Sequence, residues 1–289
     1  MLYINWAKPK LTGVIIIGYK MVCIDLDGTL LDDKRNISEI NKEAIRKATN
    51  NDIKVIISTG RIFSNAVEYA ELLGLNTPII SSSGAVIGDL HFGEFGCRNI
   101  IDYDSCRYIL EVSLNSDSKI SFSSLDTIYT NDFEMKVLLD IVKMKDDTFR
   151  NTKISYIQKY SQWDEVFKSG TVKSDIRFKK VADVIKIKNE MAKRFEVVNF
   201  TATNLEITNQ GVSKGKAIEI LAKHFGVSPN EIIAIGDSEN DLSMIKYAGM
   251  GIAMGNAGKI VIDNSDFTTE TNNNNGVAKA INKFVFNRI

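Results

Sequence analysis

The first part of the chain alternates between short apolar runs and stretches whose apolar residues recur at helical spacing. Turn-forming segments separate these stretches, and Gly74 ends the second helical one. Ser38 or Asn36 is placed to cap the first helix. The order strand, helix, strand, helix, strand predicts a parallel sheet covered by helices. The predicted strands are residues 22–24, 53–57 and a run starting at 77–80, and the predicted helices are residues 37–48 and 64–73.

The same alternation returns after residue 210. Gly226 ends one helical stretch, and Ser228 with Pro229 forms a capped turn before the next apolar run. An asparagine-rich turn, residues 272–275, precedes the last helical stretch. These elements are expected to extend the sheet that the first part of the chain begins. The predicted helices are residues 216–225, 242–248 and 275–284, and the predicted strands are residues 232–235 and 251–254.

The middle of the chain has longer amphipathic segments, and stretches in which apolar and polar residues alternate. Alternation with period two is typical of half-buried strands. We therefore expect an α+β domain, residues 85–207, inserted into a sheet domain made of residues 19–84 and 208–289. The predicted helices of the insert are residues 106–114, 133–142 and 181–195, and its predicted strands are residues 119–123, 175–179, 197–200 and 204–208.

The first 18 residues do not follow this pattern. Residues 14–17 are apolar, but Thr12 and Gly13 interrupt the run and no small-x-small cleavage site follows, which argues against a signal peptide. We expect residues 1–18 to form an extra β-segment or an N-terminal extension outside the core, and Met21 is a candidate for the natural start. No apolar run approaches the ~18–20 residues of a membrane helix, so a membrane is not expected as a partner.

Composition narrows the classes of function. The 289 residues include 36 Lys and Arg and 36 Asp and Glu, and this zero net charge does not favour a nucleic acid partner. Hydrophobic residues make up 44% and charged residues 25%, as in ordinary globular proteins. Three unclustered cysteines show neither a disulfide framework nor zinc spacing, which favours a cytoplasmic location. The two histidines, His91 and His224, are too few and too far apart to favour a His-based metal site or a Ser-His-Asp triad.

Two aspartates directly after the first predicted strand are the first candidates for chemistry. Residues i and i+2 of a strand point the same way, so Asp25 and Asp27 are expected side by side. Neighbouring carboxylates repel unless a cation or a division of proton roles relieves the repulsion, and Mg²⁺ prefers such oxygen ligands. Gly28 allows the backbone to approach a ligand closely. One aspartate can then be a nucleophile and the other a general acid and base. A turn with two solvated acids is the alternative.

Two further segments adjoin predicted helices. Thr59 and Gly60 lie between a strand and a helix, where a hydroxyl and free N–H groups form either an anion site or only an N-cap.

Lys214 precedes a helix, where it can neutralise a phosphate or lie on the surface. Its segment, residues 211–217, lacks the spacing of a P-loop and carries Ala217 in place of the metal-binding hydroxyl, so we reject a P-loop.

A further acidic pair follows the predicted strand 232–235. Asp237 leaves the end of that strand, and Asp241 lies four residues on, about one helical turn away. Parallel sheets gather their ligands at the carboxyl ends of their strands. We therefore expect the acidic residues of both segments to meet at one edge of the sheet.

The four segments occur in a specific order: DLDGT at residues 25–29, TGR at 59–61, the lysine at 214 and GDSEND at 236–241. Together they resemble the haloacid dehalogenase (HAD) superfamily, and the resemblance covers residues 20–289. TGR, Leu-Glu-Ile at 205–207 and Met-Gly-Asn-Ala at 254–257 are similar to its Cof-like subgroup. That subgroup carries a type IIB cap between its second and third motifs, where residues 85–207 lie here.

This resemblance implies a Rossmann-like parallel-sheet core with an inserted α+β cap. It also implies a Mg²⁺-dependent phosphomonoester hydrolase of small phosphorylated metabolites, such as sugar phosphates or phosphorylated cofactors. Asp25 would attack phosphorus and become an aspartyl-phosphate, and Asp27 would protonate the leaving alcohol and then activate water. The implied phosphate-binding residues are Thr59, Gly60, Lys214 and Asn240, and the implied metal ligands are Asp25, the carbonyl of Asp27, Asp237 and Asp241.

One residue departs from the subgroup. Ser83 stands where the subgroup usually has Asn, which affects one contact at the cap hinge or the substrate. A phosphomutase or phosphotransferase on the same fold is an alternative, in which an alcohol replaces water as acceptor. A non-catalytic metabolite-binding protein is another. A dehalogenase is disfavoured because Asp27 supplies the acid that ester cleavage needs.

Outside the motifs we expect structural roles. The aromatic residues of the insert are expected in the cap core rather than in a substrate pocket. Cys23 is expected to be a buried small apolar group and His224 a surface or packing residue. The sequence gives neither the identity of the substrate nor the oligomeric state. The aromatic residues in question are Phe92, Tyr129, Trp163 and Phe178.

Overall fold

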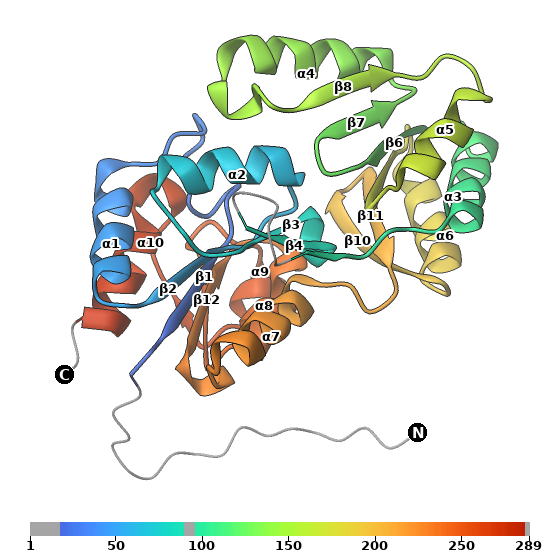
Figure 1. Ribbon diagram of the computed structural model, residues 1–289. Helices are drawn as coiled ribbons and strands as arrows, with labels where there is room; N and C mark the ends of the chain where they lie inside the picture. Colours follow the sequence, from blue (N-terminus) through green and yellow to red (C-terminus); the bar gives the residue numbers. More distant parts are fainter. Residues whose placement is uncertain (1–17, 90–95, 287–289) are drawn as a thin grey trace, which may run out of the picture.

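The computed structural model describes residues 18–89 and 96–286 (Figure 1). The expected N-terminal extension up to residue 17, with its apolar segment, lies outside these ranges, as do His91 and Phe92. Within them, no helix is long and apolar enough to cross a membrane. Cys23, Cys97 and Cys106 are free cysteines.

Five parallel strands form the central sheet in the order β14-β13-β12-β1-β2. This confirms the predicted parallel sheet, and β1 lies between the strands that carry the other sequence motifs. The short edge strand β14 was not predicted. The strands are β1 (Met21–Ile24), β2 (Lys54–Ile57), β12 (Ile232–Gly236), β13 (Met250–Ala253) and β14 (Phe267–Thr268).

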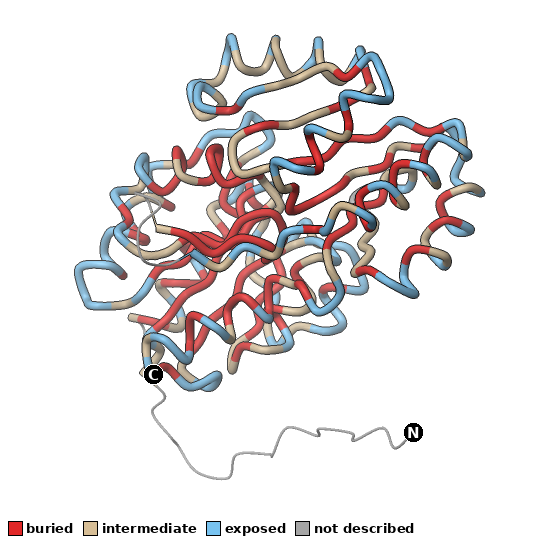
Figure 2. Tube along the Cα trace, turned by 45° about the vertical axis from the view of Figure 1, so that its right-hand side comes forward, coloured by how far each residue is buried: buried red, intermediate tan, exposed pale blue. Residues whose placement is uncertain are grey.

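Helices cover both faces of this sheet, which makes it the middle of three layers (Figure 1). Their bounds are α1 (Glu39–Asn50), α2 (Phe63–Leu72), α7 (Lys214–Phe225), α8 (Leu242–Tyr247), α9 (Lys259–Ile262) and α10 (Gly276–Ile281). Val22 and Ile24 of β1 pack with α1, α2 and α10. Met21 and Cys23 point the other way and pack with α7 and α8, so Cys23 is a buried apolar group as expected. Buried residues accordingly concentrate along the sheet (Figure 2).

The helix ends follow their capping residues. Ser38, rather than Asn36, caps α1, and its hydroxyl accepts a hydrogen bond from the Asn41 amide at 3.1 Å. Ser213 caps α7 in the same way, so this helix begins at Lys214, two residues earlier than predicted. Gly226 ends α7 in the left-handed conformation. Pro229 opens only a short 3₁₀ turn before β12.

A small antiparallel sheet connects the core to the insert. It contains β3 (Ile79–Ser81), β4 (Val86–Gly88) and β5 (Cys97–Arg98), of which only the start of β3 was predicted. Ile80 also forms a parallel bridge with Ser58, beside β2. Ile87 packs with the apolar cluster of the core. The domain boundaries at residues 84/85 and 207/208 stay a prediction.

The insert forms a six-stranded sheet in the order β10-β11-β9-β6-β7-β8, which is antiparallel except between β7 and β8. It agrees with the expected α+β cap. The strands are β6 (Lys119–Ser123), β7 (Thr127–Thr130), β8 (Lys153–Tyr156), β9 (Lys173–Arg177), β10 (Phe195–Thr201) and β11 (Asn204–Asn209). The helices are α3 (Tyr103–Asn115), α4 (Phe133–Lys145), α5 (Gln162–Ser169) and α6 (Val181–Met191).

Side chains of α3, α5 and α6 pack on one face of this sheet and form the cap core. Trp163 and Phe178 are buried there and Tyr129 packs against it, as predicted. The helix prediction for residues 181–195 is wrong at its end, because Phe195 instead begins β10 and its ring stacks on that of Tyr108. The predicted strand 175–179 begins two residues earlier, at Lys173. The segment from β7 through α4 to β8 extends over α2 (Figure 1).

Candidate active site

Three carboxylates meet at the carboxyl edge of the central sheet. Asp25 follows β1, and Asp237 follows the neighbouring strand β12. Asp241 closes the 3₁₀ turn after that strand. One oxygen from each of the three lies within 4.8 Å of the others. The edge therefore gathers the acidic residues of two sequence motifs more than 200 positions apart.

Lys214 is the cation inside this cluster. Its Nζ donates to Asp25 Oδ1 and to Asp241 Oδ1, each at 2.6 Å, and its side chain is 0% exposed. Burial lowers the pKa of Lys214, but the two carboxylates outweigh this effect and raise the pKa above its ordinary value. One positive charge thus faces three carboxylates, and Lys214 is hydrogen-bonded to two of them.

The loop after β1 brings Asp237 close to the backbone. Gly28 has φ +76°, and a Cβ built there would lie 2.4 Å from Asp237 Oδ2. Thr29 Oγ1 donates to Asp237 Oδ1 at 2.9 Å. Asn256 Nδ2 donates to the Gly28 carbonyl at 2.8 Å, which gives the motif at residues 254–257 a role in holding this loop. Only glycine at position 28 leaves room for this arrangement.

The cluster is electrostatically strained without a further cation. Burial raises the pKa of Asp25 well above its usual range, and the negative charges of Asp241 and Asp237 add to that effect against the opposing effect of Lys214. Burial and the charge of Asp241 raise the pKa of Asp237 to about 6. Oxygen ligands with a net negative charge are what a hard divalent cation prefers. The residues present therefore fit a Mg²⁺ ion.

Asp27 lies outside this cluster and is paired with Arg61. The guanidinium donates twice, from Nε to Asp27 Oδ2 at 2.7 Å and from Nη2 to Oδ1 at 2.6 Å. Burial raises the pKa of Asp27, but the hydrogen bonds and charge of Arg61 outweigh it and lower that pKa below its ordinary value. The two aspartates of the first motif thus have opposite pKa shifts because they have different partners.

Arg61 is a site residue whose partner the sequence did not indicate. Its Nη1 donates to Asn65 Oδ1 at 2.8 Å and to the Tyr69 hydroxyl at 3.0 Å. Its guanidinium also lies 5.5 Å from the centre of the Phe149 ring, which belongs to the insert. Arg61 therefore joins Asp27 to α2 and to the cap.

The second motif contributes buried backbone and hydroxyl groups. Thr59 is buried, and its Oγ1 accepts a hydrogen bond from the Arg61 amide at 3.2 Å. A Cβ on Gly60 would lie 3.3 Å from Ser83 Oγ and 3.7 Å from Asn240 Nδ2. Asn240 Oδ1 accepts a hydrogen bond from Ser238 Oγ at 2.6 Å. Gly60 and Asn240 thus come together from distant parts of the chain.

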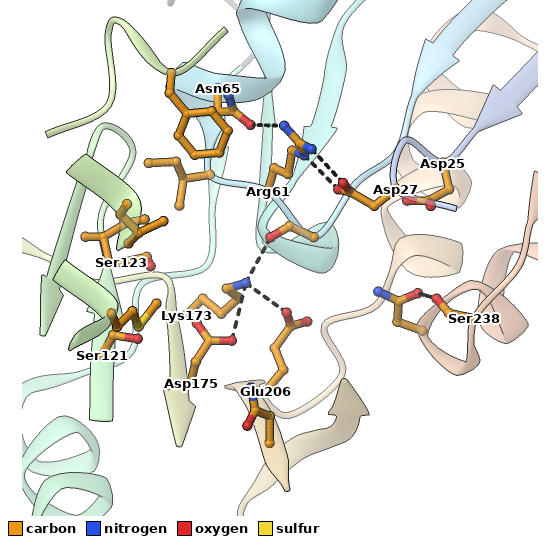
Figure 3. A pocket seen from close by; sticks show the side chains of 18 residues that line it. Asp25, Asp27, Arg61, Asn65, Ser121, Ser123, Lys173, Asp175, Glu206 and Ser238 are labelled. Atoms are coloured by element: carbon orange, nitrogen blue, oxygen red, sulfur yellow. Dashed lines mark hydrogen bonds and ion pairs between the residues drawn. The ribbon is translucent and has the colours of Figure 1, made fainter. Parts of the chain in front are cut away.

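A cavity of about 270 Å³ lies between this edge and the cap (Figure 3). Asp25, Asp27, Gly60 and Asn240 line it, whereas Thr59, Lys214, Asp237 and Asp241 are not among its lining residues. Arg61, Asn65, Ser238 and Ile62 complete the core side. The cap side combines polar and apolar groups, namely Ser121, Ser123, Ile128, Met135, Leu139, Phe149, Lys173, Asp175, Asn204 and Glu206.

The cap and the core are hydrogen-bonded across this cavity. Lys173 Nζ donates to the Gly60 carbonyl at 2.9 Å and to Glu206 Oε2 at 2.8 Å (Figure 3). Ser83 Oγ donates to Glu206 Oε1. Ser83, which departs from the subgroup pattern, therefore contacts the cap directly. The sequence predicted a strand that contains Glu206 and another that starts two residues after Lys173, but no site role for either residue, because their contacts depend on how two distant sheets meet.

Comparison with known proteins gives the family. The family model described as haloacid dehalogenase-like hydrolase matches residues 22–281. The chain belongs to this family, and it is a phosphatase of the HAD superfamily.

Curated relatives match over nearly their full length. The 5-amino-6-(5-phospho-D-ribitylamino)uracil phosphatase YcsE of Bacillus subtilis is 30% identical over 277 residues, which cover 93% of this chain and 97% of the relative. Phosphatase YwpJ of the same organism is 31% identical over a match that covers 90% of this chain and 97% of the relative.

Solved structures agree with the fold. A haloacid dehalogenase-like hydrolase from B. subtilis aligns with a TM-score of 0.79 at 30% identity, covering 91% of this chain and 98% of that chain. A HAD subclass IIB sugar phosphatase aligns with a TM-score of 0.78 at 22% identity, covering 92% and 98%, and supports the cap type at the level of fold.

Proposed function

We propose that the protein is a Mg²⁺-dependent phosphomonoester hydrolase that forms an aspartyl-phosphate on Asp25. One observation carries this proposal: the carboxylates of Asp25, Asp237 and Asp241 lie together at the edge of a cavity that Asp25 and Asp27 both line, and one buried lysine binds Asp25 and Asp241. Phosphoryl transfer needs an in-line nucleophile, a positive clamp and a metal. This edge of the sheet supplies a candidate nucleophile, a buried lysine and carboxylates that can hold a metal.

Asp25 is the nucleophile of the proposal. Its carboxylate oxygen attacks phosphorus while the bond to the leaving alcohol breaks, and Asp27 gives that alcohol its proton. In the second step Asp27 takes a proton from water, whose oxygen attacks phosphorus and releases phosphate from Asp25. Asp27 is suited to the base role as it stands, because Arg61 keeps it ionised. An incoming phosphoryl group would compete for Arg61, and Asp27 would then take from solvent the proton that it gives to the leaving alcohol in the first step.

The metal would be held by Asp25, the Asp27 carbonyl, Asp237 and Asp241. Bound there, Mg²⁺ would supply positive charge to the phosphoryl oxygens and lower the raised pKa of the Asp25 carboxyl. Lys214 supports the ionised form of Asp25 by donating to its Oδ1. The proposed phosphate contacts are the Gly60 backbone and Asn240, which line the cavity, together with Thr59 and Lys214, which are buried at the same edge of the sheet.

The proposed substrates are small phosphorylated metabolites, such as sugar phosphates or phosphorylated cofactors. A cavity of about 270 Å³ with polar and apolar lining supports a small organic leaving group. Relatives whose names state a phosphorylated ribitylaminouracil or phosphoglycolate as substrate support the same size class. We place the enzyme in the cytoplasm, with its cap in residues 85–207, and no nucleic acid or membrane partner enters the proposal.

The test is phosphate release from a panel of metabolite phosphates, with Mg²⁺ and with excess EDTA. Hydrolysis that depends on Mg²⁺ and disappears in Asp25→Asn is expected. Full activity in excess chelator would overturn the metal assignment. Conversion of a substrate to its isomer without free phosphate would favour a phosphomutase, and binding of metabolites without any turnover would favour a non-catalytic protein.

A further inference from the structure

The cap contributes a polar wall to the cavity through the alternation of three adjacent strands. Side chains of β6, β9 and β11 that point away from the cap core face the active site. Asp175, on the middle strand, lies opposite Ser121 on one neighbour and Glu206 on the other. An aspartate thus stands at the centre of the wall that faces Asp25 and Asp27.

The two carboxylates of this wall differ in how far their hydrogen-bonding capacity is used. Glu206 is 6% exposed and accepts hydrogen bonds from Ser83 Oγ and Lys173 Nζ. Asp175 is 32% exposed, and among the described residues its one side-chain partner is Lys173 Nζ at 3.6 Å, which is an ion pair but too long for a good hydrogen bond. Asp175 therefore presents an acceptor to the cavity without a matching donor.

Lys173 already donates hydrogen bonds to groups other than Asp175. It donates to the Gly60 carbonyl and to Glu206, so its ammonium holds the cap sheet against the second motif. Burial of Asp175, with the charge of Glu206 and against that of Lys173, raises the pKa of Asp175 to about 6. A donor from the substrate would satisfy this carboxylate better than the distant Lys173 does.

We propose that Asp175 is a specificity-determining residue that accepts a hydrogen bond from a hydroxyl group on the leaving alcohol. The cavity would then select monoesters of polyhydroxylated alcohols over esters of plain alkyl chains. The second acidic side chain beside it disfavours a further phosphate at this end of the cavity. This inference rests on the proposed phosphatase function and adds the chemistry of the leaving group.

The expected preference in kcat/KM follows from the strength of one hydrogen bond to Asp175. A hydrogen bond to a charged group contributes ~1.5–3 kcal/mol, which corresponds to roughly 10–100-fold in kcat/KM. A fully enclosed acceptor discriminates more strongly, but Asp175 is partly open to solvent.

The experiment compares glucitol 6-phosphate with n-hexyl phosphate, which have the same chain length and differ in their hydroxyl groups. With Mg²⁺ the wild-type protein should prefer the polyol ester by roughly 10–100-fold in kcat/KM. Asp175→Ala should lower this ratio toward one, because kcat/KM for the polyol ester falls. Asp175→Asn keeps one acceptor oxygen, so its ratio should lie between those of the wild type and Asp175→Ala. Asp126→Ala is the matched control, because Asp126 pairs with Lys153 at 2.8 Å outside the cavity.

The outcomes separate the inference from the function on which it rests. An equal rate for both esters in the wild type, or an unchanged ratio in a folded Asp175→Ala or Asp175→Asn protein, overturns the role of Asp175 and leaves the phosphatase proposal standing. Absence of phosphate release from both esters and from p-nitrophenyl phosphate overturns the phosphatase proposal itself. Thermal unfolding of each variant shows whether the fold is retained.

Discussion

Replacement of Lys214 by methionine tests the electrostatic account of the active-site cluster. Methionine matches the length of the lysine stem but removes the ammonium group that donates to Asp25 and Asp241 at 2.6 Å. Both carboxylates then stay buried without their shared cation. Breaking a buried ion pair by removing one partner costs ~3–5 kcal/mol, because an uncompensated charge remains.

The same substitution at Lys216 is the matched control. Lys216 lies on the same helix, is 57% exposed and pairs with Glu219 at 2.8 Å. Exposed pairs of this kind contribute only ~0.2–1 kcal/mol. In a protein of this size ~1 kcal/mol shifts the unfolding midpoint by roughly 2 °C. Lys214→Met should therefore lower the midpoint by roughly 6–10 °C, and Lys216→Met by no more than ~2 °C.

The assay is thermal unfolding by calorimetry in metal-free buffer at pH 7.5, followed by phosphate release with Mg²⁺. Lys214→Met should also lose most activity, because Asp25 then takes up a proton more readily. Equal unfolding midpoints for the two variants would refute the claim that Lys214 compensates the carboxylates.

Two further predictions concern the metal. Gly28→Ala and Gly74→Ala each place alanine at a similar positive φ angle, which costs ~1–2 kcal/mol in both variants, but only at position 28 does the new Cβ meet Asp237. The affinity for Mg²⁺, measured by titration calorimetry, should therefore fall in Gly28→Ala alone. An equal fall in both variants would contradict the role of Gly28. The pKa of Asp237 is about 6 without metal and that of Asp25 is also raised, so protons compete with Mg²⁺ for these carboxylates. The affinity for Mg²⁺ should weaken as the pH falls through 6, whereas a flat profile between pH 5 and 8 would be inconsistent with the raised pKa values.

The core could be predicted because its signals are local. Buried parallel strands such as β1 and β12 are short apolar runs, and the side chains that follow them lie at the strand ends. Ser38, Gly74 and Gly226 marked helix ends through capping and backbone preference. The meeting of Asp25 with Asp237 followed from the geometry of parallel strands alone.

The cap side of the site could not be predicted, because its contacts are set by the packing of two sheets. Asp175 lies in a stretch whose alternation was recognised, but alternation does not show that its polar face meets the active site. The partner of Arg61 was missed for a similar reason, since a lone arginine in a loop does not indicate Asp27 as its partner. Phe195 continued a helical pattern by chance, but it begins β10, where it pairs with Asn209 of β11 and its ring packs against Tyr108.

The central claim is that Asp25 is phosphorylated during turnover and that Asp27 completes the reaction. The most direct measurement is mass spectrometry of protein quenched in acid during turnover of p-nitrophenyl phosphate with Mg²⁺, in Asp27→Asn and Asp25→Asn. Loss of a general acid and base slows a step by ~10²–10⁴-fold, and an aryl leaving group needs little protonation, so Asp27→Asn should accumulate one phosphoryl group on Asp25. Asp25→Asn should carry none. Phosphate trapped on the Asp25→Asn protein, or full turnover by that variant, would contradict the account.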